Sequence, residues 1–473
     1  MGRGMRSILP CTALLASIVA VGAIAACSKN PSPSQEPSAP VASTASSTAT
    51  GAASVAPSAA SSAPPVASAP LGSPPPSSGP PKDVNVIVIS VDSMRADMPW
   101  AGYERPIAPR LTELEKKSVS YTRAYSISSY TSMSLGGLLG GKLPSELNRS
   151  GYFFGQYKNN TFFPKLLQDA KVKTLGVHAH GYFKDAGFEQ GFDKWEVVPN
   201  IKFDNTTDRN ITSPQSEEIS EKLLGDPALE SQRFFFWAHF LDPHDLYLAH
   251  DGIGPYGKTE RDRYDAEITY TDQHIGKLLD FIAKKSWASR TVIIVTSDHG
   301  EAFGEHGQTR HGFEIWDNLV HIPMFVVAPG AQPRKIDEPR SAIDLAPTIL
   351  DLFGVAPSVA EEAHFEGKSI VKEIYGETPA ARDVWVDLPM TSDNDSRRAL
   401  VRGKMKLTCY NNENQCKLFD LGADPNEEKP IVTGDAYKDL WAAYKAHAKT
   451  VRFVVPYSCG PGCLNKAYLN KNK

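Results

Sequence analysis

The sequence predicts an α/β sandwich, in which helices flank a mostly parallel central sheet, followed by a small antiparallel sheet near the C-terminus. The run 84–92, VNVIVISVD, is almost continuous in Val and Ile, which is typical of a strand buried on both faces. Similar runs alternate with helical patterns along the chain, as they do in α/β proteins. From about residue 398 this alternation stops, so we expect a separate small sheet there.

The elements of the sandwich can be placed in chain order. Runs like the first strand lie at 173–183, 233–244, 291–300, 322–330 and 383–389. Helical patterns lie at 108–119, 162–171, 261–286 and 344–354. The longest of them carries an apolar stripe made of Tyr264, Ile268, Ile275, Leu278, Leu279 and Ile282. The helix at 344–354 has a proline near its start and ends at Gly354, which is ordinary helix punctuation.

The N-terminus predicts export. Arg3 and Arg6 precede an apolar stretch at 8–26, and small residues lead to Cys27. This pattern resembles a bacterial lipoprotein signal, which implies cleavage before Cys27 and a lipid on its sulfur. A plain secretory signal or an anchor helix is the alternative. Ser28 after the cysteine favours anchoring in the outer membrane of a Gram-negative bacterium.

Two more features of composition bear on partners. The 50 basic residues nearly balance the 54 acidic ones, so we expect no nucleic-acid partner. Residues 28–81 are almost entirely Ala, Ser, Pro, Val, Gly and Thr, which predicts a disordered, extended tether because few large apolar side chains are present to bury.

The C-terminal region predicts its own small unit. Residues 398–410 and 416–421 suggest a hairpin and its partner strand, and 435–449 a final helix before a basic tail. Four cysteines form two short pairs, Cys409 with Cys416 and Cys459 with Cys463. In an exported chain this pattern predicts local disulfides, and a zinc site with four thiolates is the alternative.

Acidic and histidine side chains follow several predicted strands. Asp92 ends the first strand, Asp242 and His244 follow another, and Asp298 and His299 end a third. Because ligands of open α/β sheets bind beyond the carboxyl ends of strands, we expect these groups to gather into a divalent metal site. Taken singly, each Asp could equally be a helix cap or a turn former.

A family resemblance joins these positions. It is carried, in order, by the segments NVIVISVDSMRAD, APRLTELEKKSVSYTRAYS, LLGGKLP, HFLDPH, YDAEITYTDQHIGKLLDFI, VIIVTSDHGEAFGEHG, IDLAPTILDLFG and LVRGKMKL with KLFDLGADPNEE. The chain resembles the sulfatases of the alkaline phosphatase superfamily over roughly 84–430. The resemblance implies their sandwich fold with a small C-terminal sheet. We therefore expect four parts: a signal peptide at 1–26, a tether at 27–82, a sulfatase-like catalytic domain at 83–390, and a small-sheet subdomain with a tail at 391–473.

The resemblance also implies roles for individual residues. Asp92, Asp298 and His299 match metal ligands, and Thr131 matches the nucleophile, which also contacts the metal. Two histidines, His244 and His311, match positions that contact the anionic oxygens of the substrate or a second metal, and Asp242 is a weaker candidate of the same kind. Without the resemblance, Thr131 could be only the N-cap of a helix beginning near Ser134.

The chain departs from sulfatases at the nucleophile. Sulfatases have Cys or Ser there, which is oxidised to formylglycine, but Thr131 carries a methyl group on Cβ and cannot give that aldehyde. Leu135 replaces an arginine that helps to hold formylglycine, Ser93 replaces a second carboxylate, and His311 replaces a lysine. With these residues the chain resembles the phosphoester branch of the superfamily. They favour Zn²⁺ or Mn²⁺ over Ca²⁺, because imidazole suits those ions; we expect one ion and leave a second open.

Four other histidines have less defined roles. His178 and His180 follow a strand and could reach the mouth of the site, although we favour loop positions for both. His239 lies within a predicted strand, which suggests packing, and His306 should order the loop after the metal ligands.

Together these observations predict a metal-dependent hydrolase of sulfate or phosphate esters, favouring phosphoesters. Thr131 attacks to form a covalent intermediate, and His244 or His311 stabilises charge or protonates the leaving oxygen. A phosphotransferase that modifies an envelope glycan or lipid is one alternative. A non-catalytic surface binding module with a decayed site is another. The expected partners are a small-molecule, glycan or lipid ester as substrate and a membrane reached through the lipid anchor.

Overall fold

The structure of the protein is a computed structural model. It describes residues 79–151, 156–184, 186–202, 209–254, 256–390, 395–411 and 415–456. The predicted signal peptide, nearly all of the tether, Cys27 and the Cys459–Cys463 pair lie outside the described residues.

The large sheet is mostly parallel, as predicted. Its strands are β1 (Asn85–Val91), β2 (Val119–Tyr125), β3 (Lys173–His178), β4 (Lys194–Val197), β5 (Phe234–Phe240), β6 (Thr291–Ser297), β7 (His321–Val327), β8 (Arg334–Ile336) and β9 (Arg340–Ser341). Among the described residues their order is β4-β3-β5-β1-β6-β7-β2-β8, and β9 pairs with β2. The pairings from β4 to β6 are parallel, whereas β7 runs antiparallel to β6 and β2.

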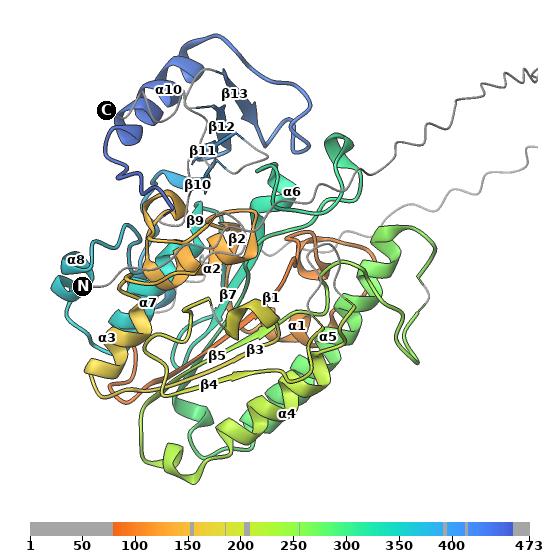
Figure 1. The fold of residues 1–473 in the computed structure, drawn as a ribbon, viewed down its shortest axis with the longest axis vertical. Helices are drawn as coiled ribbons and strands as arrows, with labels where there is room; N and C mark the ends of the chain where they lie inside the picture. The colour runs from red at the N-terminus through yellow and green to blue at the C-terminus, as the bar shows by residue number, and fades with distance from the viewer. Residues whose placement is uncertain are drawn as a thin grey trace, which may run out of the picture. The chain divides into compact units, whose positions relative to one another are not determined.

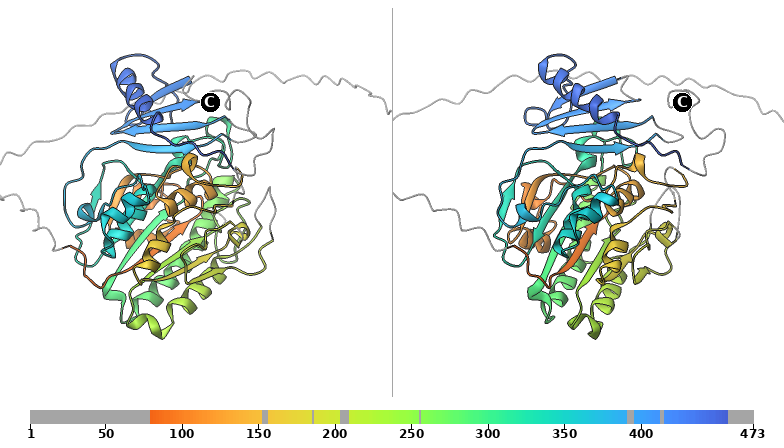
Figure 2. Two further views of the ribbon diagram at one scale, coloured as in Figure 1. Left: turned by 60° about the vertical axis from the view of Figure 1, so that its left-hand side comes forward. Right: turned by 90° about the vertical axis from the view of Figure 1, so that its left-hand side faces the viewer.

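Helices cover both faces of this sheet, as Figures 1 and 2 show. One layer contains α1 (Pro109–Glu115), α4 (Ser213–Leu224) and α5 (Glu260–Ala283), and the other contains α2 (Thr131–Gly140), α3 (Phe163–Asp169) and α7 (Leu345–Leu352). Side chains of β1 alternate between the two layers: Ile87 and Ile89 pack toward α5, and Val86 and Val88 pack toward α7. Two buried faces explain why the strand needs apolar residues at successive positions.

The longest helix begins with a capping box. Thr259 Oγ1 accepts a hydrogen bond from Asp262 N at 3.1 Å, and Asp262 Oδ2 accepts one from Thr259 N at 2.9 Å. The helix therefore starts at Glu260, one residue before the predicted start, and ends at Ala283, three residues before the predicted end. Its predicted apolar stripe packs against the sheet, with Tyr264, Ile268, Ile275, Leu278 and Ile282 buried.

The C-terminal part forms a small antiparallel sheet with the order β10-β11-β12-β13, which Figure 2 shows in blue. Its elements are β10 (Val384–Leu388), β11 (Arg397–Arg402), β12 (Met405–Tyr410), β13 (Gln415–Asp420) and the helix α10 (Asp435–Ala448). The run 383–389, grouped above with the strands of the large sheet, instead forms β10, because it pairs with β11. The predicted disulfide between Cys409 and Cys416 is present and joins paired positions of β12 and β13.

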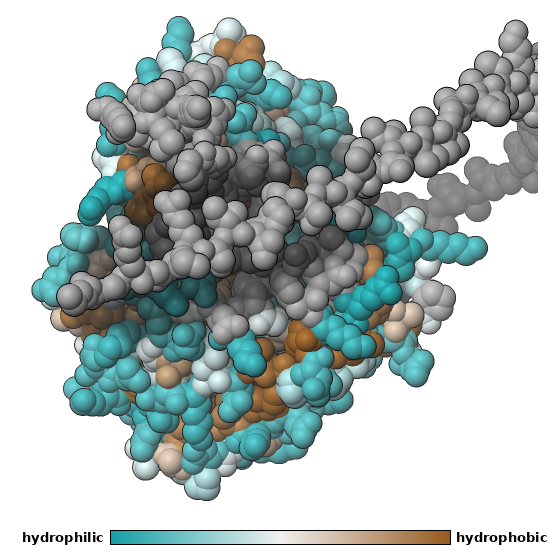
Figure 3. Space-filling model, in the orientation of Figure 1, coloured by the Kyte–Doolittle hydropathy of each residue, from teal (hydrophilic) through white to brown (hydrophobic). Residues whose placement is uncertain are grey.

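Three short helices complete the described fold: α6 (Asp317–Val320), α8 (Pro357–Glu362) and α9 (Val371–Ile374). Figure 3 shows a largely hydrophilic face with a band of hydrophobic side chains beside α5. Within the described ranges, the structure contains no helix whose length and apolarity would let it cross a bilayer.

Candidate active site

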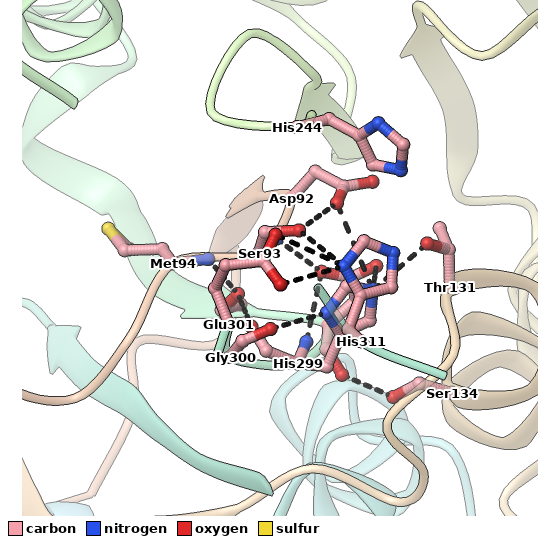
Figure 4. Close-up of polar contacts among 12 residues, drawn as sticks. Asp92, Ser93, Met94, Thr131, Ser134, His244, His299, Gly300, Glu301 and His311 are labelled. Atoms are coloured by element: carbon pink, nitrogen blue, oxygen red, sulfur yellow. Dashed lines mark hydrogen bonds and ion pairs between the residues drawn. The ribbon is translucent and has the colours of Figure 1, made fainter. Parts of the chain in front are cut away.

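The carboxyl ends of β1, β5 and β6 lie side by side and carry the polar residues singled out in the sequence. Val91 at the end of β1 is in register with Ser297 at the end of β6, so Asp92 and Asp298 follow at the same edge of the sheet. Ser93 N links the two ends by donating to Asp298 Oδ1 at 3.2 Å. The chain thus brings its strand-end carboxylates together, in the arrangement drawn in Figure 4.

Thr131 enters the same cluster from the start of α2. It is the first residue of the helix, three residues earlier than predicted, and Tyr130 occupies the N-cap position. Ser134 Oγ anchors this end of the helix by donating to the carbonyl oxygen of Asp298 at 2.6 Å. The Oγ1 atom of Thr131 lies 3.0 Å from His299 Nε2. The hydroxyl is therefore directed at the strand-end cluster, and the N-cap role considered for Thr131 falls to Tyr130.

Two glycines make this close approach feasible. A Cβ atom on Gly300, directly after His299, would lie 2.1 Å from the carbonyl oxygen of Asn318. A Cβ atom on Gly137, in the first two turns of α2, would lie 2.9 Å from the carbonyl oxygen of Lys142. At both positions the neighbouring atom belongs to the backbone, so a side chain would force the surrounding backbone to shift.

The centre of the cluster contains more hydrogen-bond acceptors than donors. His299 Nδ1 donates to the carbonyl oxygen of Gly300 at 2.9 Å, which leaves a lone pair on Nε2. That lone pair faces Asp298 Oδ2 at 3.3 Å and Asp92 Oδ1 at 3.8 Å, as well as the hydroxyl of Thr131. All these side chains are buried, and Asp298 Oδ2 accepts no hydrogen bond from the described residues.

This arrangement fits a divalent cation. Two carboxylates and a neutral imidazole converge on one point, and their ligand atoms lie within 4.8 Å of one another. Without a positive charge, two buried carboxylates beside a ring lone pair would be costly, because Asp298 Oδ2 has lost its water without gaining a donor. A cation among Asp92, Asp298 and His299 would satisfy all three, with the Thr131 hydroxyl at its edge.

Two histidines, His180 and His239, orient the second carboxylate oxygen of Asp92, Oδ2. Trp237 Nε1 donates to Ser90 Oγ at 2.8 Å, so the Ser90 hydroxyl hydrogen is available for His239 Nδ1, also at 2.8 Å. His239 therefore carries its proton on Nε2, which lies 3.4 Å from Asp92 Oδ2. His180 Nε2 lies 3.2 Å from the same oxygen. The position of the carboxylate is thus fixed by a chain of buried side chains.

These neighbours keep Asp92 ionised. Burial alone would raise the pKa of the Asp92 carboxyl, but the charge of His244 and the hydrogen bonds from His180 and His239 outweigh it and hold the pKa well below its usual range. A permanently ionised carboxylate is what a cation ligand requires.

A second wall of the site is formed by His244, His311 and Glu301. His311 Nδ1 lies 3.2 Å from Glu301 Oε2, and His244 Nδ1 lies 3.1 Å from the carbonyl oxygen of Asp245. The rings of His244 and His311 lie 5.0 Å apart between centroids. Burial lowers the pKa of His311 to about 3 and raises that of Glu301 to about 7. The two histidines therefore lie together beside the cluster, and their contact with the substrate or a second metal stays a prediction.

Asp242 does not belong to this cluster. Its Oδ1 accepts hydrogen bonds from Thr212 N at 2.6 Å and Thr212 Oγ1 at 2.5 Å, and its Oδ2 accepts one from Ser213 N at 2.8 Å. These contacts satisfy the start of α4. The substrate-binding role predicted for Asp242 is therefore not supported, because both of its oxygens are engaged in capping a helix.

His180 and Glu301 contribute more to the site than the sequence predicts. His180 follows β3 in the letters HAH, a pattern that favours a loop position, yet its side chain contacts Asp92. Glu301 follows the SDHG motif directly, a position that could have suggested a role beside the ligands. His178, also assigned to a loop, is the buried last residue of β3, stacked on Trp195 at 4.3 Å between centroids. His239 is buried within β5, but it also contacts Asp92.

The fold and this buried Asp–His cluster can be compared with those of known proteins, and sequence comparison identifies the family. The profile of the sulfatase family matches residues 84–355, more than half of the chain. The profile of the C-terminal region of N-sulphoglucosamine sulphohydrolase matches residues 304–453. The chain belongs to the sulfatase family.

Curated relatives are distant. A choline-sulfatase of Rhizobium meliloti is 28% identical over 200 residues, which covers 40% of this chain and 38% of the relative. An arylsulfatase of Clostridium perfringens is 26% identical over 235 residues, covering 48% of this chain and 46% of the relative. The chain thus spans less than half the length of these relatives. An ulvan-active sulfatase of Formosa agariphila matches over more of its length, 79%, at 23% identity and with 76% of this chain covered.

Solved structures share the fold. The phosphonate monoester hydrolase of Agrobacterium radiobacter aligns with a TM-score of 0.65 at 15% identity, covering 78% of this chain and 95% of that one. A protein solved with its substrate D-glucosamine-2-N,6-O-disulfate aligns with a TM-score of 0.62 at 17% identity, covering 78% and 97%. At these identities the likeness concerns the fold alone.

Proposed function

We propose that the protein is a metal-dependent hydrolase of sulfate or phosphate esters that favours phosphoesters and uses Thr131 as its nucleophile. The observation that carries this proposal is the position of the Thr131 hydroxyl, 3.0 Å from His299 Nε2 at the edge of a buried acceptor cluster. A threonine in a merely structural role would not need to direct its hydroxyl at a ring nitrogen that faces two carboxylates.

Asp92, Asp298 and His299 would hold the cation of this site. When bound, a divalent cation lowers the pKa of the nucleophile and neutralises charge on the transferred group. The imidazole ligand supports Zn²⁺ or Mn²⁺ rather than Ca²⁺, which prefers ligand sets made of oxygen alone. Asp92 is held for this task by His180 and His239.

The residues of the site account for each bond change. The Thr131 oxygen attacks the phosphorus or sulfur atom and gives its proton to His244 or His311. The bond from that atom to the ester oxygen breaks, and the same histidine passes the proton on to the leaving alcohol. A water molecule then attacks the phospho- or sulfothreonine. The products are one alcohol and one inorganic anion, with the Thr131 hydroxyl restored.

The start of α2 assists binding of the anion. Thr131 is the first residue of a ten-residue helix, so the positive end of the helix dipole lies at the proposed nucleophile. Placed there, the substrate's anionic group would lie within reach of Thr131, His244 and His311.

Phosphoesters are favoured over sulfate esters because Thr131 cannot form the aldehyde that sulfatases use. The likeness in fold to a phosphonate monoester hydrolase supports this choice. The names of the curated relatives support sulfate esters instead. Both classes therefore belong in the test.

The test is a substrate panel. Purified protein is stripped with a chelator, reconstituted with Zn²⁺, Mn²⁺ or Ca²⁺, and assayed with an aryl sulfate, an aryl phosphate, an aryl phosphodiester and an aryl phosphonate. We expect the highest kcat/KM on a phosphoester with Zn²⁺ or Mn²⁺. We expect no turnover of any ester in the sample stripped with the chelator. Turnover of the sulfate alone would remove the preference, and no turnover with any metal would refute the proposal.

We also propose that Cys27 carries a lipid that anchors the protein in the cell envelope, with residues 27–82 as a tether. The support is the lipoprotein-like sequence around Cys27. Metabolic labelling with a fatty acid should mark the wild-type protein and not Cys27→Ser. Equal labelling of the two would refute the anchor, and would leave the enzymatic proposal untouched.

A further inference from the structure

A second group of metal-ligand atoms lies on the far side of Asp92 from His299. It consists of Asp92, His180 and His244, whose ligand atoms lie within 4.8 Å of one another. His180 follows β3 and His244 follows β5, so two neighbouring parallel strands deliver these imidazoles to one edge of the sheet. The function proposed above assigns His180 no bond to a cation.

The two carboxylate oxygens of Asp92 face different groups. Oδ1 lies 3.8 Å from His299 Nε2, on the side of the first cluster. Oδ2 lies 3.2 Å from His180 Nε2, on the side of the second. A carboxylate held in this way can give one oxygen to each of two cations without moving.

The protonation of the imidazoles distinguishes ligands from supports. His244 Nδ1 donates to the carbonyl oxygen of Asp245, so Nε2 is the nitrogen with which His244 would bind a cation in place of a proton. The rings of His180 and His244 lie 5.2 Å apart between centroids. His239 also reaches Asp92 Oδ2, but its Nε2 bears the proton because Nδ1 is hydrogen-bonded by Ser90. His239 therefore positions Asp92. His180 Nε2 also donates to Asp92 Oδ2 in the absence of a cation, but the Ser90 contact that holds the His239 proton on Nε2 is not made to His180, so a cation bound by His180 and His244 would take the place of a proton.

We propose that the active site binds two divalent cations that share Asp92, the second being held by His180 and His244. The proposal rests on the function proposed above, because it takes the first cation to lie among Asp92, Asp298 and His299. It also bears on the substrate. The ligands of the two sites include only two carboxylates, so two divalent cations would leave two positive charges. That excess matches a phosphate monoester dianion better than a sulfate ester monoanion.

Metal stoichiometry tests the proposal directly. Full-length protein stripped of metal is dialysed against Zn²⁺ or Mn²⁺, and bound metal is measured by elemental analysis. We expect two equivalents in the wild type and one in both His180→Gln and His244→Gln. The matched control is His306→Gln, because His306 stacks on Trp316 at 3.9 Å and belongs to neither group; it should keep two equivalents. Thermal unfolding of each variant checks that it is folded.

The variants also separate the two sites. Asp298→Asn should lose the first cation and keep the second, whereas Asp92→Asn should lose both. Reconstitution with Co²⁺ gives a visible absorption band for each occupied site, and His180→Gln should lose one of the two bands. A single equivalent in the wild type would overturn the proposal, as would two equivalents retained in folded His180→Gln and His244→Gln.

Failure of this proposal can be distinguished from failure of the proposed function. One equivalent of metal with phosphoesterase activity would refute the second site alone. Two equivalents without turnover of any ester in the panel would refute the proposed function and leave the two-cation site in place.

Discussion

Replacing Thr131 by valine tests the proposed nucleophile with little disturbance of the fold. Valine has nearly the shape of threonine, and the site is only 3% exposed, so the methyl that replaces the hydroxyl fits the same space. The lost contact is the hydrogen bond between Oγ1 and His299 Nε2 at 3.0 Å, which contributes about 1 kcal/mol to folding. We therefore expect the free energy of unfolding to fall by ~1 kcal/mol at most.

The effect on catalysis should be much larger. Without the hydroxyl no covalent intermediate can form, and we expect kcat/KM to fall by at least ~10³-fold, or about 4 kcal/mol of transition-state stabilisation. Thr131→Ser is the matched control: it keeps the hydroxyl, loses one methyl, and should stay within about tenfold of the wild type.

The assays are initial rates on the best ester of the panel and intact-protein mass spectrometry after rapid quenching. Mass spectrometry should show the mass of one phosphoryl or sulfuryl group on the wild type and on Thr131→Ser, and none on Thr131→Val. If Thr131→Val retained activity within tenfold of the wild type, or still became labelled, Thr131 could not be the nucleophile.

Four further predictions concern stability. Asp242→Ala should lower the free energy of unfolding by about 2 kcal/mol through loss of the α4 cap and change kcat/KM by less than about threefold; a large kinetic effect in urea-stable protein would restore its substrate-binding role. Replacing both Cys409 and Cys416 by serine opens a loop with a sequence separation of 7 and should lower the free energy of unfolding by about 2 kcal/mol, with activity unchanged; denaturation curves that coincide with the wild type would contradict this. The pKa of His447 is lowered to about 4 from an ordinary 6.5 by burial and by the charge of Arg398, so the unfolded chain binds more protons between these values. Stability should therefore fall as the pH drops from 6.5 to 4, by up to about 2 kcal/mol, and His447→Gln should flatten this slope; an unchanged slope would exclude His447 as its cause. Adding Zn²⁺ or Mn²⁺ to metal-stripped protein, at a hundred times the dissociation constant of the ion, should raise the free energy of unfolding by about 2.7 kcal/mol. Calorimetry with Asp298→Asn should show a smaller increase in this free energy.

The fold could be predicted because the apolar composition of its strands indicates that they are buried. β1 and β5 are apolar at nearly every position, and a strand of that kind needs helices on both faces. The run at 383–389 shows the limit. It also contains several apolar residues, but its partner is β11 and not a strand of the large sheet. The composition of a segment indicates that it forms a buried strand. It does not indicate which other strand it pairs with, because that depends on the tertiary structure.

For the candidate site, too, some features follow from the sequence and others only from the tertiary structure. The sequence by itself determined that carboxylates and histidines follow the strands, and its resemblance to sulfatases predicts that Thr131 matches the nucleophile. It could not separate Asp242 from Asp92, because both are aspartates after an apolar strand. Only the tertiary structure decided between them, since Asp242 meets the N–H groups that begin α4 while Asp92 meets His180, His239 and the first cluster.

His180 illustrates the physical reason. Its role depends on the atom that its Nε2 reaches, and that atom belongs to Asp92, on a strand separated from β3 by β5. Local sequence sets the type of side chain and the element that carries it. Which of its nitrogens is free, and what lies opposite, are set by contacts between segments far apart in the chain, and those exist only after the sheet has assembled.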